Sequence, residues 1–77
     1  MNKTRRTAIE ALRERLDVLV TETETLRDEE QEYYDNMPES FQNGDKGITA
    51  EGSISALEAA YDSISSAIES LEEAINT

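Results

Sequence analysis

The side chains best suited to chemistry or recognition lie near the middle of the chain, between positions 27 and 42. This segment, RDEEQEYYDNMPESFQ, holds six carboxylates and three of the chain's four aromatic residues. Aromatic rings and methionine supply contact area at interfaces, and carboxylates select a basic partner. The segment therefore predicts a recognition surface. In the alternative interpretation, the acids solvate a helix end while Tyr33, Met37 and Phe41 close the end of a helical bundle.

The sequence predicts neither a metal site nor a catalytic residue. Asp28 and Glu32, or Glu29 and Glu32, share a helix face, but there is no His and no second carboxylate pair to complete a di-metal site. The segment NGDKGITAEG lacks the acid spacing of a calcium loop. With no Cys and no Gly-rich phosphate loop either, we expect a non-enzymatic protein without a cofactor.

Charge is distributed unevenly along the chain. The formal net charge is -11, yet residues 1–15 carry five basic and two acidic side chains, leaving two basic and sixteen acidic ones for residues 16–77. Such a surface disfavours direct nucleic-acid binding and attracts basic proteins, although acidity can also serve solubility alone. No apolar run is long enough to cross a membrane. We therefore expect a cytoplasmic protein.

Two heptad stripes predict two long helices. In the first, Ile9, Leu16, Thr23 and Glu30 occupy position a, and position d is held by Leu12, Leu19, Leu26 and Tyr33. The second runs from Ile54 to Ile75 with the same spacing and has Ala60, Ala67 and Ala74 beside its stripe. The expected helices span about 4–34 and 49–76, the second capped by Thr49.

The segment between the stripes predicts a connection over residues 35–48, about a dozen residues long. Pro38 ends the first helix and opens a short turn through Gln42, which Asn43 and Gly44 close. Gly47 adds a second point of backbone freedom. Connections between packed helices usually have two to eight residues, so the length of this one is typical of a functional segment.

Charge favours an antiparallel hairpin, because it brings a basic N-terminal end to an acidic C-terminal end. The residues expected to meet are Arg5, Arg6, Arg13 and Arg15 with Glu69, Glu72 and Glu73. Two helices of this size bury too little for a stable fold. We therefore expect a homodimer, or a higher even-numbered assembly, in which paired hairpins form a four-helix bundle.

The expected dimer suggests a second kind of site. An antiparallel dimer would bring Arg13 and Arg15 of one copy toward Tyr33, Tyr34 and Lys46 of the other. Guanidinium groups hold phosphate and aromatic rings stack on a base, so this combination is typical of nucleotide binding. The acidic remainder of the chain argues against it unless the acids face away.

The central segment, its Gly- and Lys-containing spacer and the following heptads resemble a family of short acidic helical proteins encoded by phages, prophages and mobile elements. That family carries an N-x-P-E-x-L-Q motif, which Asn36, Pro38, Glu39, Phe41 and Gln42 match with Phe in place of the commoner Leu. The second helix departs from the family by being rich in Ser and by containing Gly52. The resemblance implies a phage-like origin and, by association, a counter-defence role in a bacterial host.

Three functions follow as expectations. The first is stoichiometric binding that blocks a bacterial immune protein through the acidic surface and the aromatic turn. The second is a sponge for a nucleotide immune signal, of cyclic dinucleotide or ADP-ribose type, held in pockets at the dimer interface. The third is a structural coiled-coil adaptor.

Overall fold

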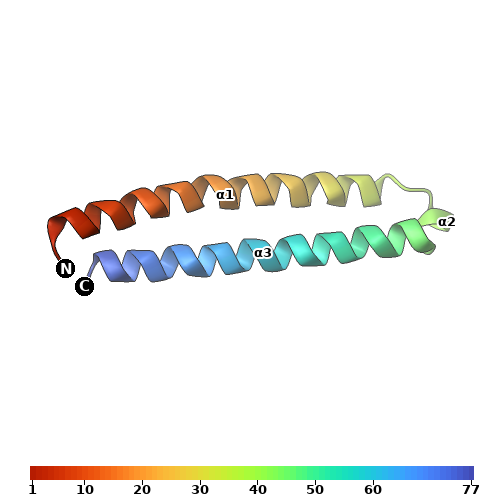
Figure 1. Cartoon of the computed structure of the whole chain (residues 1–77). Helices are drawn as coiled ribbons and strands as arrows, with labels where there is room; N and C mark the ends of the chain where they lie inside the picture. Colours follow the sequence, from red (N-terminus) through yellow and green to blue (C-terminus); the bar gives the residue numbers. More distant parts are fainter.

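The computed structural model describes residues 1–77 as three helices: α1 (Lys3–Asp35), α2 (Glu39–Gln42) and α3 (Asp45–Ile75). Helices α1 and α3 lie antiparallel along their whole length, with both termini at one end and α2 at the other (Figure 1). The molecule measures 58 × 14 × 13 Å and its radius of gyration is 17.4 Å, against about 11.5 Å for a compact domain of this length. The predicted all-α antiparallel hairpin is confirmed.

Helix α1 is capped at its start, and three of its threonine hydroxyls are hydrogen-bonded within the helix. The side chain of Asn2 accepts a hydrogen bond of 2.7 Å from the backbone N–H of Arg5. The hydroxyls of Thr21, Thr23 and Thr25 each donate to the carbonyl oxygen four residues earlier. The β-branched segment is helical, as the heptad stripe predicts.

The turn has the form predicted from Pro38. Helix α1 ends at Asp35, with Asn36 as its C-cap, and the short helix α2 begins directly after Pro38. The Gln42 side chain donates a hydrogen bond of 3.0 Å from Nε2 to the backbone oxygen of Tyr34. The same carbonyl accepts a hydrogen bond of 3.1 Å from the backbone N–H of Met37. The Gln42 bond is therefore a second one at the end of α1, and it fastens α2 to that end.

The predicted start of the second long helix is wrong. Helix α3 begins at Asp45 after an N-cap at Gly44, so Thr49 is not the cap and the connection covers residues 36–44 rather than 35–48. The reason is close packing at Gly47, which is buried. A Cβ atom at Gly47 would lie 1.9 Å from the backbone oxygen of Gln42. Glycine lets α3 start early, directly against α2.

The face that α1 turns toward α3 also differs from the prediction. The less exposed positions of α1 recur in a 3-4 pattern that contains heptad positions a and e: Arg6, Ile9, Arg13, Leu16, Val20, Thr23, Arg27, Glu30 and Tyr34. The predicted stripe combines a with d instead. The middle of the a–e face lies about 50° around the helix axis from the middle of the a–d face, so α1 is rotated by that angle from the predicted orientation.

Helix α3 turns its predicted stripe inward. Ala50, Ile54 and Ile68 are the buried apolar residues, and Leu57, Tyr61, Ile64 and Leu71 are half-buried between them. Of the alanines beside this stripe, Ala60 and Ala67 remain exposed and Ala74 is half-buried. With so few buried residues, the single hairpin has a thin core.

The two helical glycines of α3 give a matched stability test. Gly47→Ala should lower the free energy of unfolding by at least about 2 kcal/mol, because the added Cβ meets the Gln42 backbone. Gly52→Ala should raise it by about 0.5–1 kcal/mol, because nothing lies within 4 Å of that site and Ala favours helix. Urea unfolding followed by circular dichroism, at one fixed protein concentration, measures both. Equal effects would contradict the packing at Gly47.

Candidate functional site

One flank of the hairpin carries cross-helix polar contacts between heptad e positions, and we call it the charged flank. The Arg13 guanidinium lies 3.9 Å from a Glu72 carboxylate oxygen. Arg27 lies 3.5 Å from Glu58, and the Tyr34 hydroxyl donates a hydrogen bond of 2.9 Å to Glu51. These contacts recur at multiples of seven residues on each helix. They therefore hold α1 and α3 in a single register.

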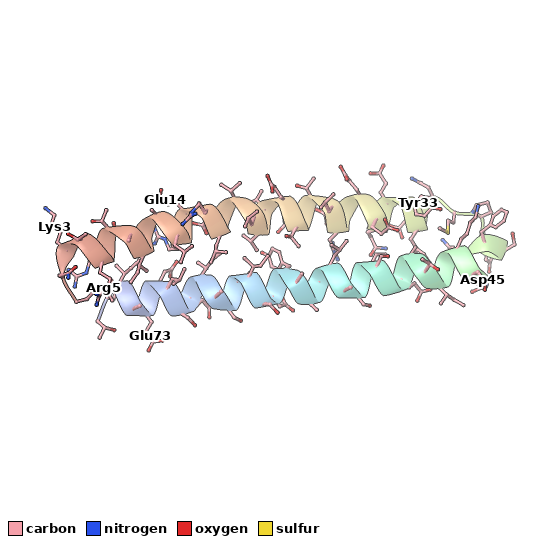
Figure 2. The ribbon with its side chains drawn as sticks, viewed as in Figure 1. Lys3, Arg5, Glu14, Tyr33, Asp45 and Glu73 are labelled. Atoms are coloured by element: carbon pink, nitrogen blue, oxygen red, sulfur yellow. The ribbon has the colours of Figure 1, made fainter.

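The expected basic-to-acidic contact at the open end is confirmed in one pair only. Arg13 pairs with Glu72, whereas no ion pair joins Arg5, Arg6 or Arg15 to Glu69 or Glu73. Figure 2 places Lys3 and Arg5 at the same end as Glu73, so the charges share an end without forming close pairs. Long-range attraction between these groups still favours the antiparallel arrangement.

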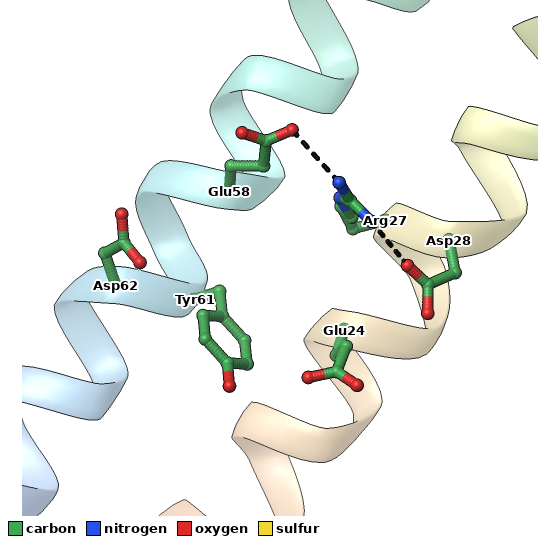
Figure 3. A pocket seen from close by; sticks show the side chains of 6 residues that line it. All are labelled: Glu24, Arg27, Asp28, Glu58, Tyr61 and Asp62. Atoms are coloured by element: carbon green, nitrogen blue, oxygen red, sulfur yellow. Dashed lines mark hydrogen bonds and ion pairs between the residues drawn. The ribbon is translucent and has the colours of Figure 1, made fainter.

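An acidic pocket of about 340 Å³ opens on the charged flank, near the middle of the rod. Its lining residues are Glu24, Arg27, Asp28, Glu58, Tyr61 and Asp62. The Tyr61 ring lies between the carboxylates of Glu24 and Asp62, and dashed lines mark the contacts of Arg27 (Figure 3). Arg27 pairs with Asp28 and Glu58. Glu24 and Asp62 have no cation within ion-pair distance.

Hydrogen bonds raise the pKa values of two groups on this flank, Arg27 and Tyr34. The bond from Arg27 to Asp28 is the main reason that the pKa of Arg27 is raised above its ordinary value. The bond from the Tyr34 hydroxyl to Glu51 is likewise the main reason that the pKa of Tyr34 is raised, and partial burial acts in the same direction. Both groups therefore keep their protons over the whole physiological range.

The turn brings together only part of the predicted site. Gln42 contacts the Tyr34 backbone, and the Lys46 ammonium lies 5.9 Å from the centre of the Phe41 ring. Asn36 caps α1 and Pro38 precedes α2, so both have structural roles, while Glu39 occupies the first turn of α2. Tyr33 and Phe41 are each 53% exposed. The interpretation in which Tyr33, Met37 and Phe41 close the end of a helical bundle stays a prediction, because it concerns an assembly of more than one chain.

Arg13 and Arg15 lie far from the rest of the predicted site within one chain. Twenty-one residues of helix separate Arg13 from Tyr34, which is about 30 Å. Arg13 is already paired with Glu72, and Arg15 is exposed. The single hairpin therefore does not assemble the predicted combination of guanidinium groups, Tyr33, Tyr34 and Lys46.

The other flank is apolar. Leu12, Leu19, Leu26 and Tyr33, the d residues of α1, are 40–55% exposed. A groove of about 690 Å³ runs beside them and is lined by Leu26, Glu29, Glu30, Tyr33, Ser53, Ala56 and Leu57. We call the four d residues of α1, together with Ser53 and Ala56 of α3, the apolar flank. Large side chains on α1 thus border two small ones on α3, Ser53 and Ala56, with Leu57 beside them.

Several residues of the acidic pocket are missing from the sequence prediction. Glu24, Glu58, Tyr61 and Asp62 lie on two helices and meet only when the register of the hairpin is fixed. The e positions of both heptads could have identified Glu58 as the partner of Arg27, and the b positions beside them hold Glu24 and Asp62. Arg13, Arg27 and Tyr34 on one helix match glutamates at the same position of the other.

Comparison of the chain with protein-family models, curated proteins and solved structures finds no match. The resemblance to the phage-encoded family therefore stays a prediction. No group of three or more His, Cys, Asp or Glu side chains is arranged to hold a metal ion. Neither long helix is apolar enough over a sufficient length to cross a membrane.

The Tyr34–Glu51 bond predicts a pH effect with a definite sign. Because the folded pKa is raised, this bond stabilises the fold fully below the unfolded tyrosine pKa of about 10. The stabilisation is lost as pH rises through the folded pKa. In a Tyr33→Phe, Tyr61→Phe background, ultraviolet titration of Tyr34 should shift to lower pH when Glu51 is replaced by Gln. An unchanged titration curve would contradict the contact.

Proposed function

We propose that this protein is a non-enzymatic binding protein that works as a homodimer and holds a basic protein through its charged flank. The observation that carries the proposal is the acidic pocket, where Glu24 and Asp62 flank the Tyr61 ring without a cation of their own. A lysine or arginine side chain entering there would meet two carboxylates and one aromatic ring. Charge-assisted hydrogen bonds and a cation–π contact would then hold it.

The remaining charge supports a basic partner. Ion pairs involve only Asp28, Glu58 and Glu72 among the eighteen acidic side chains. The other fifteen stand along a rod 58 Å long and create a field that attracts basic surfaces and repels phosphate backbones. Such a field raises the association rate and makes binding sensitive to salt.

The dimer belongs to the same proposal. One hairpin leaves the apolar flank in water, and a four-helix bundle of two hairpins would cover it. A dimer also carries two acidic pockets, so a partner with two basic protrusions gains from simultaneous binding. Within this proposal the protein acts in the cytoplasm of a bacterial host and blocks an immune protein by occupancy, as the phage-like resemblance implies.

The geometry of the hairpin favours a protein partner over a nucleotide. A nucleotide sponge needs the guanidinium groups of Arg13 and Arg15 close to Tyr33, Tyr34 and Lys46. One chain keeps them about 30 Å apart, and an antiparallel dimer that brought them together would still leave Arg13 paired with Glu72. The adaptor alternative requires no pocket. It gives the unpaired Glu24 and Asp62 carboxylates no role.

A basic peptide tests the pocket directly. The probe is a fluorescein-labelled peptide of alternating arginine and alanine, and its binding is followed by anisotropy at several salt concentrations. Glu24→Gln with Asp62→Asn should weaken binding by about tenfold, because two charge-assisted contacts are lost. Glu10→Gln with Glu14→Gln is the matched control, since it changes the net charge equally at exposed sites near the N-terminus.

The control variant should bind the peptide within about twofold of the unmodified protein, because its acids lie outside the pocket. Binding should also weaken steeply as salt rises. Equal losses in both variants would overturn the pocket as the binding site. Salt-independent binding, or no binding at all, would overturn the proposed recognition of basic proteins.

A further inference from the structure

We propose that a second copy of this chain covers the apolar flank, with the two α1 helices packed against each other in antiparallel orientation. This inference rests on the proposed function insofar as that function includes a homodimer, and it specifies which face and which orientation the dimer uses. Leu12 of one copy would lie against Tyr33 of the other, and Leu19 against Leu26.

The first support is the amount of surface that the hairpin exposes. Its accessible area is 5564 Å², whereas a compact monomer of 8.6 kDa exposes about 4,700 Å². The excess is about 900 Å², and each partner of a standard interface contributes about 800 Å². One interface per chain therefore brings the exposed area to that of an ordinary globular fold.

The second support is the shape and position of the apolar surface. The four d residues recur every seven residues over about 30 Å of α1, and the groove beside Leu26 and Tyr33 has small side chains, Ser53 and Ala56, on its α3 side. Large side chains next to small ones allow two layers to interdigitate closely. A second helix is the element that can follow a row of side chains of this length.

The third support is charge, which selects the orientation. Heptad position g borders the d stripe on α1 and holds Arg15, Glu22 and Glu29. In an antiparallel pair, Arg15 of each copy lies near Glu29 of the other, so opposite charges meet twice, against one contact between the two copies of Glu22 at the two-fold axis. In a parallel pair, Arg15 of one copy and Glu29 of the other would be about 21 Å apart along the helices, so these opposite charges would not meet.

The antiparallel arrangement also satisfies the symmetry of a homodimer. A two-fold axis near residues 22–23 places every large d residue opposite another large d residue, so no apolar side chain is left over. The interface is isologous and closes on itself. In this interface, Arg15 of one copy pairs with Glu29 of the other, so the Arg15 guanidinium is not available to a nucleotide.

Cysteine pairing tests the orientation, because the chain contains no Cys. Leu12→Cys and Tyr33→Cys chains are purified separately, and each is refolded from urea and oxidised with glutathione, alone or mixed. The mixture should yield a disulfide-linked dimer, and neither chain alone should, since 21 residues of helix separate the two positions. Leu19→Cys mixed with Leu26→Cys provides a second pair if the first disturbs packing.

Substitution and light scattering test the face independently. Leu19→Glu with Leu26→Glu should raise the dimer dissociation constant by at least about a hundredfold, because four leucine side chains, which form two Leu19–Leu26 contacts, are lost per dimer. Ile48→Glu is the matched control: Ile48 is 63% exposed and lies outside the apolar flank. It should leave the dissociation constant unchanged.

The outcomes separate the two proposals. A monomeric mass for the unmodified protein at all concentrations would overturn the dimer in both. A dimer in which Leu12→Cys alone becomes cross-linked would overturn the antiparallel orientation and leave the proposed function standing. A dimer that dissociates on Ile48→Glu but not on the paired leucine substitutions would overturn the apolar flank as the interface.

Discussion

Two helices that meet along one line can each cover only one strip of the other, and this limit governs the whole molecule. Helix α3 uses its apolar stripe in that contact, with Ile54 and Ile68 buried. Helix α1 turns its a and e positions inward, so its d residues are left at the edge. The result is one flank of polar pairs and one flank of leucines.

The polar pairs between the two helices accompany this rotation of α1. Arg13, Arg27 and Tyr34 each reach a glutamate of α3, and their long or aromatic side chains also cover apolar surface with their non-polar parts. Exposed ion pairs are individually weak, so their contribution is to fix register and rotation together. Turning α1 by about 50° to bury its leucines would break all three contacts at once.

Much of the fold could be predicted from sequence because it depends on local signals. The 3-4 spacing predicts two helices, Pro38 ends the first, and Asn43–Gly44 marks the turn, all as the structure has them. The start of α3 could not be predicted, because it depends on Gly47 meeting Gln42. The acidic pocket likewise could not be predicted, because it depends on Glu24 and Asp62 coming together from two helices. The rotation of α1 could not be predicted either, because the a–d stripe gives no indication that positions a and e would face α3 and position d would not.

In the proposed assembly, a second copy covers the flank that the hairpin leaves exposed, and the opposite flank stays free for a basic partner. Small-angle X-ray scattering tests the central claim most directly, because it reports mass and length together. The account predicts twice the chain mass with a longest dimension still close to the 58 Å of one hairpin. A single-chain mass, or a particle nearly twice as long and joined at the exposed turn, would contradict it.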